Sequence, residues 1–378
     1  MSMFSLVRLG EVVDIKGGGT PSRRIAEYWN GQIPWATVKD LKGVILSETE
    51  EYVSREGINN SAANVIPAGN IIIATRMALG RAAINTVDMA INQDLKALKC
   101  NGKVDARYLL HFLNSKASFL ENSGKGATVK GITLDVVRDL EIPLPPLPEQ
   151  RRIAAILDKA AAIRRKRQQA IRLTEEFLRS VFLDMFGDPV TNPKGWEVKR
   201  LDEISDIQSG ITKGRKANVQ DGHIDLDEIK EIEATSMEIA RYLLKKGDIL
   251  LTEGGDPDKL GRGAVWYGEI DPCIHQNHIF RVRPNTEFLL PEYASAQIGS
   301  IRGKKYFLKS AKQTTGIASI NKTQLSGFPT LIPPVTLQEK FVEIVRKQKV
   351  LVTKNNESAT NKDDCFNSIV QRAFRGEL

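Results

Sequence analysis

The sequence repeats itself at an offset of 188 residues, and this repeat limits the possible folds more than any other feature. Without a gap, Ile132 aligns with Ile320, and the match continues until Phe186 aligns with Phe374. Shorter segments upstream repeat in the same order with small insertions: RLGEVVDIKGG (8–18) as RLDEISDIQSG (200–210), LGRAAI (79–84) as LGRGAVW (260–266), AINQDLKAL (90–98) as CIHQNHIFR (273–281), and ARYLLHFLNS (106–115) as PEYASAQIGS (291–300). Chance does not explain so many matches in one order, so the chain is a tandem duplication of a domain followed by a helix.

A proline step precedes a long helical pattern in each copy. The segments LPPLPEQRRIAAIL (144–157) and IPPVTLQEKFVEIV (332–345) open runs in which a seam residue recurs at alternating three- and four-residue steps. This spacing is typical of a coiled coil and predicts helices over 148–188 and 336–378. About 36 residues of helix are roughly 54 Å long. Proline restricts its own φ and disfavours helix in the residue before it, so each domain is expected to meet its helix at a defined angle.

We expect the two helices to pair, because neither can bury its seam alone and the second is polar in its centre. The first helix leads away from one domain and the second must lead back, so the pair is antiparallel. The domains themselves contain β-branched or leucine-rich runs such as IIIATR (71–76) and DILLTE (248–253), with one amphipathic helix each. The predicted fold class is α+β: two mixed α/β domains with substantial β content, separated by two long antiparallel helices in a coiled-coil-like rod, with a pseudo-two-fold internal repeat.

Composition narrows the class of protein. No apolar run reaches the roughly 18 residues that a membrane span needs, and the N-terminal segment lacks the pattern of a secretory signal. Three scattered cysteines do not form a disulfide framework, which favours a reducing, cytoplasmic location. The net charge of +8 favours a polyanionic partner.

The sequence lacks a recognisable catalytic set. It contains no G-x-x-x-x-G-K-[ST] phosphate loop, and the DPD of GGDPDKLGRG (254–263) has no further carboxylates at a suitable spacing for a nuclease. The strongest candidate metal ligands are Cys273, His275 and His278, but alternation along a strand would place His278 on the opposite face. The aligned positions in the first copy are Ala90, Asn92 and Leu95. None of these is an expected zinc ligand, so we predict a structural or DNA-contact role and no metal.

Basic and hydroxyl-bearing loops recur in both copies. The loop NSGKGATVKG (122–131) has a counterpart in LKSAKQTTGIAS (308–319), and further basic groups lie in TPSRR (20–24), KGRK (213–216) and KLGR (259–262). Lysines and hydroxyls bind phosphates, whereas Gln, Asn and Arg can bind base edges. One such loop is more often only a solvated surface, but their presence in both copies favours nucleic-acid binding. The predicted DNA-binding residues are Thr20, Arg23, Arg24, Lys39, Arg76, Lys125, Thr128, Lys130, Lys213, Arg215, Lys259, Arg262, Lys312, Gln313 and Thr314.

Motifs over essentially the full length carry a family resemblance. They are IKGGGTPS (15–22), EYWNGQIPWATVKDLKG (27–43), LGRAAINT (79–86), LGRGAVWY (260–267), the two segments that open the helices, FGDP (186–189) and AFRGEL (373–378). Together, and in this order, they resemble the specificity (S) subunit of type I restriction–modification systems. The second copy departs from the opening pattern, with SGITKGRK (209–216) in place of GGGTPSRR (17–24), so its DNA-facing residues are less well defined.

The resemblance implies two target recognition domains, 1–147 and 189–335, each reading one half of a bipartite DNA sequence, and two spacer helices, 148–188 and 336–378. It implies a non-catalytic subunit without a cofactor of its own. Its partners would be double-stranded DNA, two modification subunits that methylate adenine with S-adenosylmethionine, and restriction subunits that cleave with ATP and Mg²⁺.

The two copies differ in how well they match. The helices keep their register, which suits two identical protein partners, whereas the loops diverge, which suits two different half-sites. The predicted partner-binding residues are Gln150, Ile153, Phe177, Gln338, Phe341 and Phe374.

Two other functions remain open at this point. A coiled-coil adaptor would bind only proteins, and its binding would be insensitive to salt because no counterions are released from DNA. A stand-alone DNA-modifying enzyme would methylate or cut DNA without partners. The bases of each half-site and the spacer between them do not follow from the sequence.

The paired helices predict a molecular ruler. Half-sites read from one side of the duplex lie about one helical turn, or ~34–36 Å, apart. Deleting one turn from the helices should change the number of spacer bases and leave the bases of both half-sites unaltered, because the reading loops are untouched. Sequencing the methylated sites of such a variant measures both quantities. Altered half-site bases would contradict the ruler.

Overall fold

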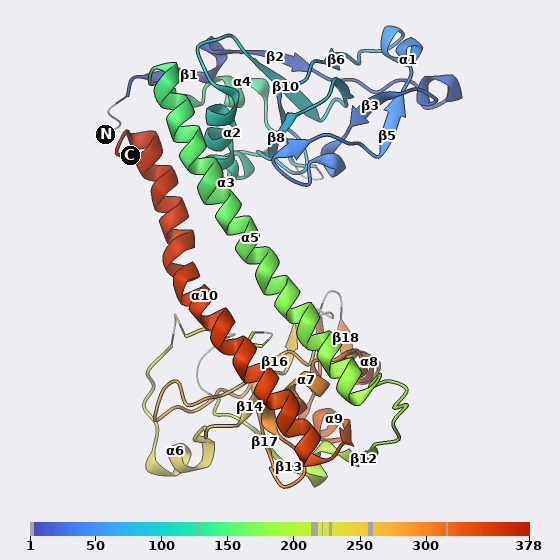
Figure 1. The fold of residues 1–378 in the computed structure, drawn as a ribbon, viewed down its shortest axis with the longest axis vertical. Coiled ribbons are helices and arrows are strands. Elements are labelled where there is room, and N and C mark those ends of the chain that lie inside the picture. The colour runs from blue at the N-terminus through green and yellow to red at the C-terminus, as the bar shows by residue number, and fades with distance from the viewer. Residues whose placement is uncertain are drawn as a thin grey trace. The chain divides into compact units, whose positions relative to one another are not determined.

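The structure is a computed structural model that describes residues 4–126, 129–212, 218–220, 222–226, 229–255, 260–314 and 317–378. Of residues 313, 314, 317 and 351–365 it describes only the backbone. The chain forms two compact units, unit 1 with Met1–Gln168 and Glu357–Leu378, and unit 2 with Gln169–Asn356 (Figure 1). Each unit is described by itself. No described helix is long and apolar enough to cross a lipid bilayer.

The chain is a mixed α+β protein with several sheets and two long helices, α5 (Leu147–Phe186) and α10 (Val335–Arg375), each of which is shared between the units. The predicted spans were 148–188 and 336–378. The remaining elements of unit 1 are β1 (Leu6–Arg8), η1 (Leu9–Glu11), β2 (Val13–Gly17), η2 (Ala26–Trp29), β3 (Ile33–Ala36), η3 (Val38–Asp40), β4 (Ile45–Leu46), β5 (Glu51–Val53), α1 (Arg55–Asn59), β6 (Val65–Ile66), β7 (Ile71–Ala74), β8 (Ala82–Asn85), β9 (Met89–Ile91), β10 (Leu95–Cys100), α2 (Ala106–Ser115), α3 (Ala117–Asn122), α4 (Leu134–Arg138) and β11 (Glu141–Pro143).

Unit 2 repeats the elements of the main sheet and of the strand pair that joins the ends of the domain, and has other elements between them. Its elements are β12 (Glu197–Arg200), η4 (Leu201–Glu203), β13 (Ser205–Ser209), α6 (Ser236–Tyr242), β14 (Ile249–Thr252), β15 (Gly254–Gly255), β16 (Gly263–Val265), β17 (Ile279–Pro284), α7 (Pro291–Ile298), α8 (Ile301–Ser310), β18 (Lys312–Thr314), β19 (Ile317–Ser319), α9 (Lys322–Ser326) and β20 (Pro329–Ile332).

Both units build the same main sheet. Its strand order is β2-β10-β7-β8 in unit 1, with β4 added beyond β8, and β13-β17-β14-β16 in unit 2. The shared neighbours are all antiparallel. The central strand β7 is buried along its whole length. Because both of its faces are covered, its sequence IIIA is apolar throughout and does not alternate with polar residues. A second pair, β1–β11 or β12–β20, joins the two ends of each domain.

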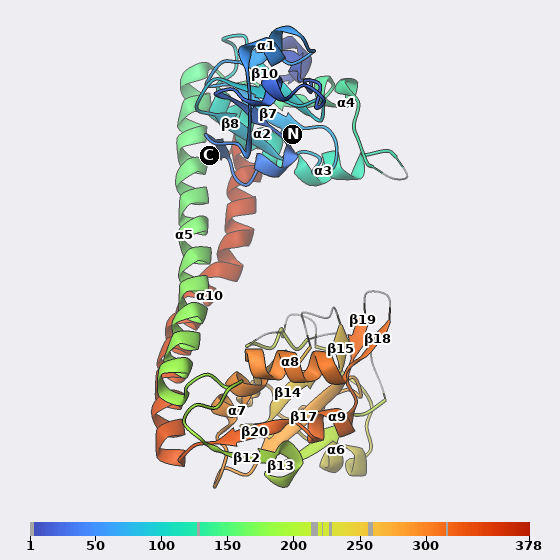
Figure 2. The ribbon, with the colours of Figure 1, turned by 90° about the vertical axis from the view of Figure 1, so that its right-hand side faces the viewer.

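The units differ in what surrounds this common sheet. Unit 1 has a further sheet in the order β5-β3-β9-β6, into which the segment without a match in the second copy, KGGGTPSRRIAEYWNGQIPW (16–35), leads. Unit 2 has α6 and the three-stranded sheet β15-β19-β18, which lies next to α8 in Figure 2. The duplication therefore preserved the scaffold and replaced its attachments.

A buried glutamine ties the long helix of unit 1 to its domain. The Gln150 side chain, in the first turns of α5, is fully buried. Its Oε1 accepts from the backbone N–H of Asp105 at 2.8 Å, and its Nε2 donates to the carbonyl oxygens of Lys103 at 3.0 Å and Pro145 at 2.8 Å. One side chain thus satisfies three backbone groups, two before α2 and one in the proline step.

Unit 2 repeats this arrangement with Gln338 of α10. Its Oε1 accepts from the Leu290 N–H at 2.8 Å, and its Nε2 donates to the carbonyl oxygens of Phe288 at 2.8 Å and Pro333 at 2.9 Å. The proline step is therefore part of a hydrogen-bonded joint rather than a loose linker. We refer to Gln150 and Gln338 with these partners as the glutamine clamps.

Aromatic rings complete the joint in each unit. In unit 1, Phe374 near the end of α10 lies 5.2 Å from the Tyr108 ring of α2, in the core that also holds Ile153 and Leu157 of α5. In unit 2, Phe186 at the end of α5 lies 4.6 Å from the Tyr293 ring of α7. The start of one long helix and the end of the other therefore share the core of each unit.

One repeated contact has opposite charge in the two units. In unit 1, Arg107 of α2 lies 3.6 Å from the Asp158 carboxylate of α5. In unit 2, Glu292 of α7 occupies the position of the arginine and lies 2.7 Å from Arg346 of α10. The duplicated joint is thus conserved in geometry and reversed in sign.

The glutamine clamps predict a measurable contribution to stability. Gln150→Ala and Gln338→Ala should each lower the free energy of unfolding by about 2–4 kcal/mol, because buried backbone groups lose their partners. Urea unfolding measures the change. As a control, Gln169→Ala at an exposed position of α5 should have an effect within about 0.5 kcal/mol. Equal effects at clamp and control positions would show that the clamps contribute little.

Candidate nucleic-acid interface

Loops from distant parts of the chain meet at one end of the main sheet in unit 1. The loop after β2 is joined to the turn before β10 by a hydrogen bond from Gly19 N to Ile91 O at 2.9 Å. The end of β7 is joined to the same turn from Thr75 N to Asp94 O at 2.9 Å, and to a fourth segment from Ile132 N to Thr75 O at 2.9 Å. We refer to the described parts of these four segments, 18–22, 92–94, 75–77 and 125–132, as loop cluster 1.

Unit 2 assembles the equivalent segments in the same way. Ile211 N donates to His275 O at 2.8 Å, Glu253 N to His278 O at 3.0 Å, and Ile320 N to Glu253 O at 2.8 Å. We refer to the described parts of 210–212, 276–278, 253–255 and 312–320 as loop cluster 2. Three shared backbone hydrogen bonds show that the two clusters are structurally equivalent.

Glycine is required where the first loop crosses the turn. A Cβ on Gly18 would lie 2.1 Å from the Ile91 carbonyl oxygen, and one on Gly210 would lie 2.0 Å from that of His275. These distances are far below any contact that a Cβ tolerates, so both loops start at a glycine for the same steric reason.

The structure corrects the sequence alignment here by one residue. The shared hydrogen bonds align His275 with Ile91 and His278 with Asp94, whereas the sequence alignment placed Asn92 and Leu95 at these positions. The sequence alignment was wrong because it matched the identical residues Gln93 and Gln276. Structural equivalence is defined by the backbone hydrogen bonds, which shift this match by one residue. The third candidate metal ligand, Cys273, therefore corresponds to Met89.

Loop cluster 1 gathers four of the predicted DNA-binding residues. Thr20 donates to the Gln93 side chain, and the Arg76 guanidinium lies 3.5 Å from the Asp94 carboxylate. Lys125 pairs with Gly131 through the backbone, the Lys130 carbonyl accepts from Met77 N, and both lysine side chains are exposed. Three cations and one hydroxyl from three separate segments thus lie around the turn 92–94.

Lys96 joins this cluster although the sequence gave no reason to select it. Its ammonium donates to the carbonyl oxygens of Gln93 at 2.5 Å and Leu95 at 3.1 Å. Burial lowers its pKa, an effect that the nearby Asp94 partly offsets.

The other predicted residues of unit 1 have a different environment. Arg23 pairs through both terminal nitrogens with Glu51 and lies 3.5 Å above the Trp29 ring. The hydrogen bond from Arg23 lowers the pKa of Glu51, so this pair is charged and mutually neutralising. Arg23 would have to leave its carboxylate to bind a phosphate, whereas Arg24 and Lys39 are simply exposed. A DNA contact by Arg23 would therefore have to compete with its ion pair to Glu51.

Fewer of the predicted residues can be placed in unit 2. Lys312 is exposed on β18, and Arg262 is half-buried, its carbonyl accepting from Thr252 N at the end of β14. The residues outside the described part of the chain are Thr128 in unit 1 and Lys213, Arg215 and Lys259 in unit 2. The side chains of Gln313 and Thr314 are likewise not described.

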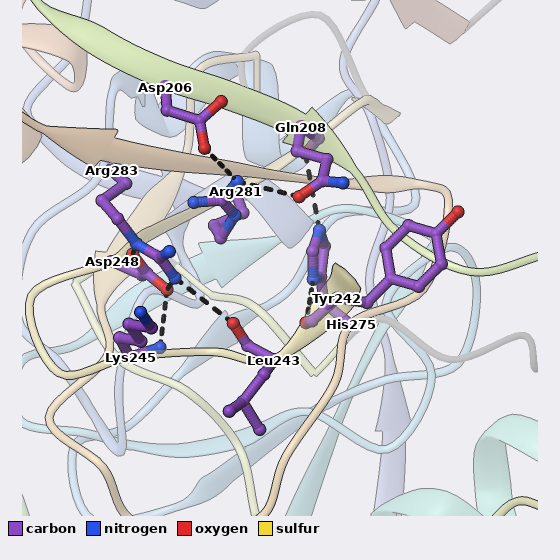
Figure 3. A network of polar contacts seen from close by, with 9 residues as sticks. All are labelled: Asp206, Gln208, Tyr242, Leu243, Lys245, Asp248, His275, Arg281 and Arg283. Atoms are coloured by element: carbon purple, nitrogen blue, oxygen red, sulfur yellow. Dashed lines mark hydrogen bonds and ion pairs between the residues drawn. The ribbon is translucent and has the colours of Figure 1, made fainter. Parts of the chain in front are cut away.

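A buried polar network supports loop cluster 2 (Figure 3). Arg281 of β17 is almost completely buried and donates to Asp206 at 2.6 Å and Gln208 at 2.8 Å, both on β13. Its Nε and Nη1 have no hydrogen-bond partner among the described residues. The network stiffens the end of β13, from which the first loop of the cluster departs.

The His275 ring forms the other half of this network. Its Nδ1 faces the Tyr242 carbonyl at 3.3 Å and its Nε2 faces the Gln208 carbonyl at 3.4 Å, so it joins α6 to β13. Burial lowers its pKa, although both carbonyl contacts raise it. Unit 1 has Ile91 at this position and packs it in an apolar core, so the polar support is particular to unit 2.

The three candidate metal ligands make separate contacts. His278 pairs with Glu253 at 2.7 Å, the Cys273 thiol lies near the Ile274 carbonyl, and His275 is enclosed as described above. Within the described ranges, no group of three or more His, Cys, Asp or Glu side chains is arranged to hold a metal ion.

The predicted partner-binding residues lie mostly inside the chain. Gln150 and Gln338 form the glutamine clamps, Ile153 and Phe341 are each 1% exposed, and Phe374 packs on Tyr108 and Phe112. Side chains enclosed in this way cannot form a first contact with another protein, so their placement does not support that prediction. Phe177 differs, since 47% of it is exposed on α5.

A family model described as the type I restriction modification DNA specificity domain matches residues 1–173 and 193–360. The chain belongs to this family. The match covers both copies of the repeat, including the loop clusters and the starts of both long helices.

Known members of the family show the same relation in sequence and in fold. The chain is 28% identical over 227 residues to the MjaIX specificity subunit of Methanocaldococcus jannaschii, covering 55% of this chain and 52% of that one. It is 34% identical over 158 residues to the EcoR124I/EcoR124II specificity subunit of Escherichia coli, covering 40% and 39%. The chain thus spans about half the length or less of these two relatives. The solved S subunit from M. genitalium has a similar fold, with a TM-score of 0.59 at 15% identity over 99% of this chain and 96% of that one.

Acid is expected to destabilise unit 2 through His275. Burial holds the pKa of folded His275 below its ordinary value, whereas an unfolded histidine titrates near 6.5. As the pH falls below about 6.5, the unfolded state binds a proton that the folded state excludes, and the free energy of unfolding falls by at most about 1.4 kcal/mol per pH unit.

The variant His275→Gln should remove this contribution, so its unfolding free energy should fall less steeply than that of the wild type between pH 7 and 5. Urea unfolding at several pH values measures the slopes, with the exposed Gln32→Ala as a control that keeps the wild-type slope. Parallel curves for wild type and His275→Gln would contradict the assignment.

Proposed function

We propose that the chain is the non-catalytic DNA specificity subunit of a type I restriction–modification complex, in which each unit reads one half of a bipartite DNA sequence. The observation that carries this proposal is the pair of equivalent loop clusters. The same backbone joints present different side chains in the two units, which is what a protein needs to recognise two different half-sites with one scaffold.

The side chains of the loop clusters suit DNA. Arg76, Lys125 and Lys130 in cluster 1, and Lys312 in cluster 2, bring positive charge to the loops, and cations neutralise phosphates and release counterions. Phosphate contacts fix the position of a protein on the duplex, while amide and guanidinium groups read base edges in the major groove. A domain that presents both kinds of group can bind and discriminate.

The long helices suit the spacing and recruiting roles. Each glutamine clamp fixes the direction in which a helix leaves its domain, so half-site separation would follow from helix geometry rather than from linker flexibility. Exposed apolar side chains on α5, with Ile163 at 59%, Leu173 at 51% and Phe177 at 47% exposed, lack a covering element among the described residues. We assign Phe177 and these neighbours to the surface that recruits two modification subunits.

The chemistry would then reside in the partners. Modification subunits would methylate adenine with S-adenosylmethionine, and restriction subunits, where present, would use ATP and Mg²⁺. This chain would supply DNA position, register and partner docking, which are the tasks for which its residues are suited.

Methylome sequencing tests the proposal. Cells that express the modification subunits encoded with this chain should carry a bipartite methyladenine mark only when this chain is also present, because it alone would select the sequence. The triple variant Arg76→Ala, Lys125→Ala, Lys130→Ala should reduce the mark by weakening phosphate binding. A mark that persists without this chain, or no mark with all subunits present, would overturn the proposal.

A further inference from the structure

One amide side chain occupies the same place in both loop clusters. The turn before β10 presents Gln93, and the equivalent turn before β17 presents Asn277, because the shared hydrogen bonds align Asp94 with His278. Neither residue stood among the predicted DNA-binding residues. An amide retained at the centre of two otherwise different clusters requires an explanation.

The backbone under Gln93 is rigid. Asn92 accepts from Asp94 N at 3.1 Å and donates to the Asp94 carboxylate at 3.2 Å, and its own N–H donates to Ala36 O at 2.9 Å. The Gln93 side chain itself is exposed. Its Oε1 accepts from Thr20, and its Nε2 has no partner among the described residues. The amide is thus oriented by one hydrogen bond and otherwise open.

Asn277 is presented in a similar way. Its N–H donates to Ile211 O at 2.9 Å, and the turn closes with Ile279 N to Gln276 O at 3.1 Å. The side chain is half-buried, and its amide forms no hydrogen bond with any described residue. A polar group placed this firmly, whose donors and acceptor have no partner in the described part of the chain, is suited to bind an external partner.

The neighbours of Gln93 favour a base over a phosphate as that partner. Gln93 lies beside cations suited to phosphates, Arg76 and Lys96, while the amide itself is neutral. A neutral amide gains little from a phosphate, but Gln and Asn can donate to N6 and accept from N7 of one adenine. Cations that hold the backbone would leave the amide facing the major-groove edge.

The residues next to the amides explain how the half-sites could differ. Asp94 is paired with Arg76 in unit 1, whereas its counterpart His278 is paired with Glu253 in unit 2. The residue after the amide is therefore a carboxylate in unit 1 and an imidazole in unit 2, so the adjacent base contacts would differ while the amide contact is shared.

We propose that Gln93 and Asn277 are equivalent specificity-determining residues, each reading one adenine in the major groove of its own half-site. This inference rests on the proposed function. It adds the residue, the base and the prediction that each substitution affects one half-site only.

The first test uses the same methylome measurement with Gln93→Ala and Asn277→Ala. Each variant should replace one required adenine by a mixture of bases in one half-site, and leave the other half-site unchanged. The two variants should relax opposite halves. The matched control is Gln32→Ala. Gln32 is an exposed amide directly before β3, whereas Asn92 contacts the far end of that strand at Ala36, so this variant should leave the methylated DNA sequence unaltered.

The second test measures binding by the assembled methyltransferase to oligonucleotides in which the candidate adenine is replaced by 7-deazaadenine, which lacks the N7 acceptor. Wild type should lose about 5- to 150-fold in affinity, the range that a bidentate contact is worth. The Gln93→Ala complex should bind both oligonucleotides equally. A merely structural role would weaken binding to both and would not remove this difference.

The outcomes separate the inference from the function on which it rests. If wild type produces no bipartite mark, the proposed function fails. If wild type produces the mark but both variants keep every base of it, or both relax the same half, the base-reading role is overturned and the specificity function stands. Unfolding measurements on both variants exclude loss of the folded chain as the cause of a lost mark.

Discussion

The buried glutamine of each clamp is the contact on which the rest of the structure depends. It satisfies backbone groups of the domain and of the proline step at once, so that domain, elbow and helix form one hydrogen-bonded unit. A buried amide with every polar atom paired is rigid, because any movement leaves a polar group unsatisfied. Under the proposed function, loop clusters that hold a fixed register along DNA would need such a joint between each domain and its long helix.

Comparison of the two units distinguishes the parts that are the same in both from the parts that differ. The main sheets, the clamps and the aromatic contacts are alike in the two units, while the loops that meet at the sheet ends carry different side chains and different supports. Unit 1 packs Ile91 in an apolar core under its cluster, whereas unit 2 places His275 and Arg281 in a polar network. Two different supports under equivalent backbone joints allow the loop clusters to diverge without loss of the scaffold.

The sequence was sufficient for the fold class and much less so for the site. Proline steps and heptads predicted the long helices closely, because helix periodicity extends over many residues, and the repeat predicted two similar domains. The sequence did not show that Gln150 and Gln338 are buried, because a glutamine at the start of a helix does not reveal which backbone groups it will bind. The register around His275 was wrong by one residue, since loop equivalence depends on backbone hydrogen bonds between segments distant in sequence. For the same reason, Gln93 was not among the predicted DNA-binding residues.

The ion pairs of opposite sign in the two joints bear on how such a gene can recombine. Arg107 meets Asp158 in the first joint, whereas Glu292 meets Arg346 in the second. If the two domains traded places on their helices, arginine would face arginine and carboxylate would face carboxylate. A crossover that carries α2 or α7 onto the other long helix would therefore bring like charges together, at a cost of up to about 1 kcal/mol for an exposed pair, whereas one confined to the preceding loops and strands would not. The sign reversal thus favours exchanges that leave each domain helix with its own long helix.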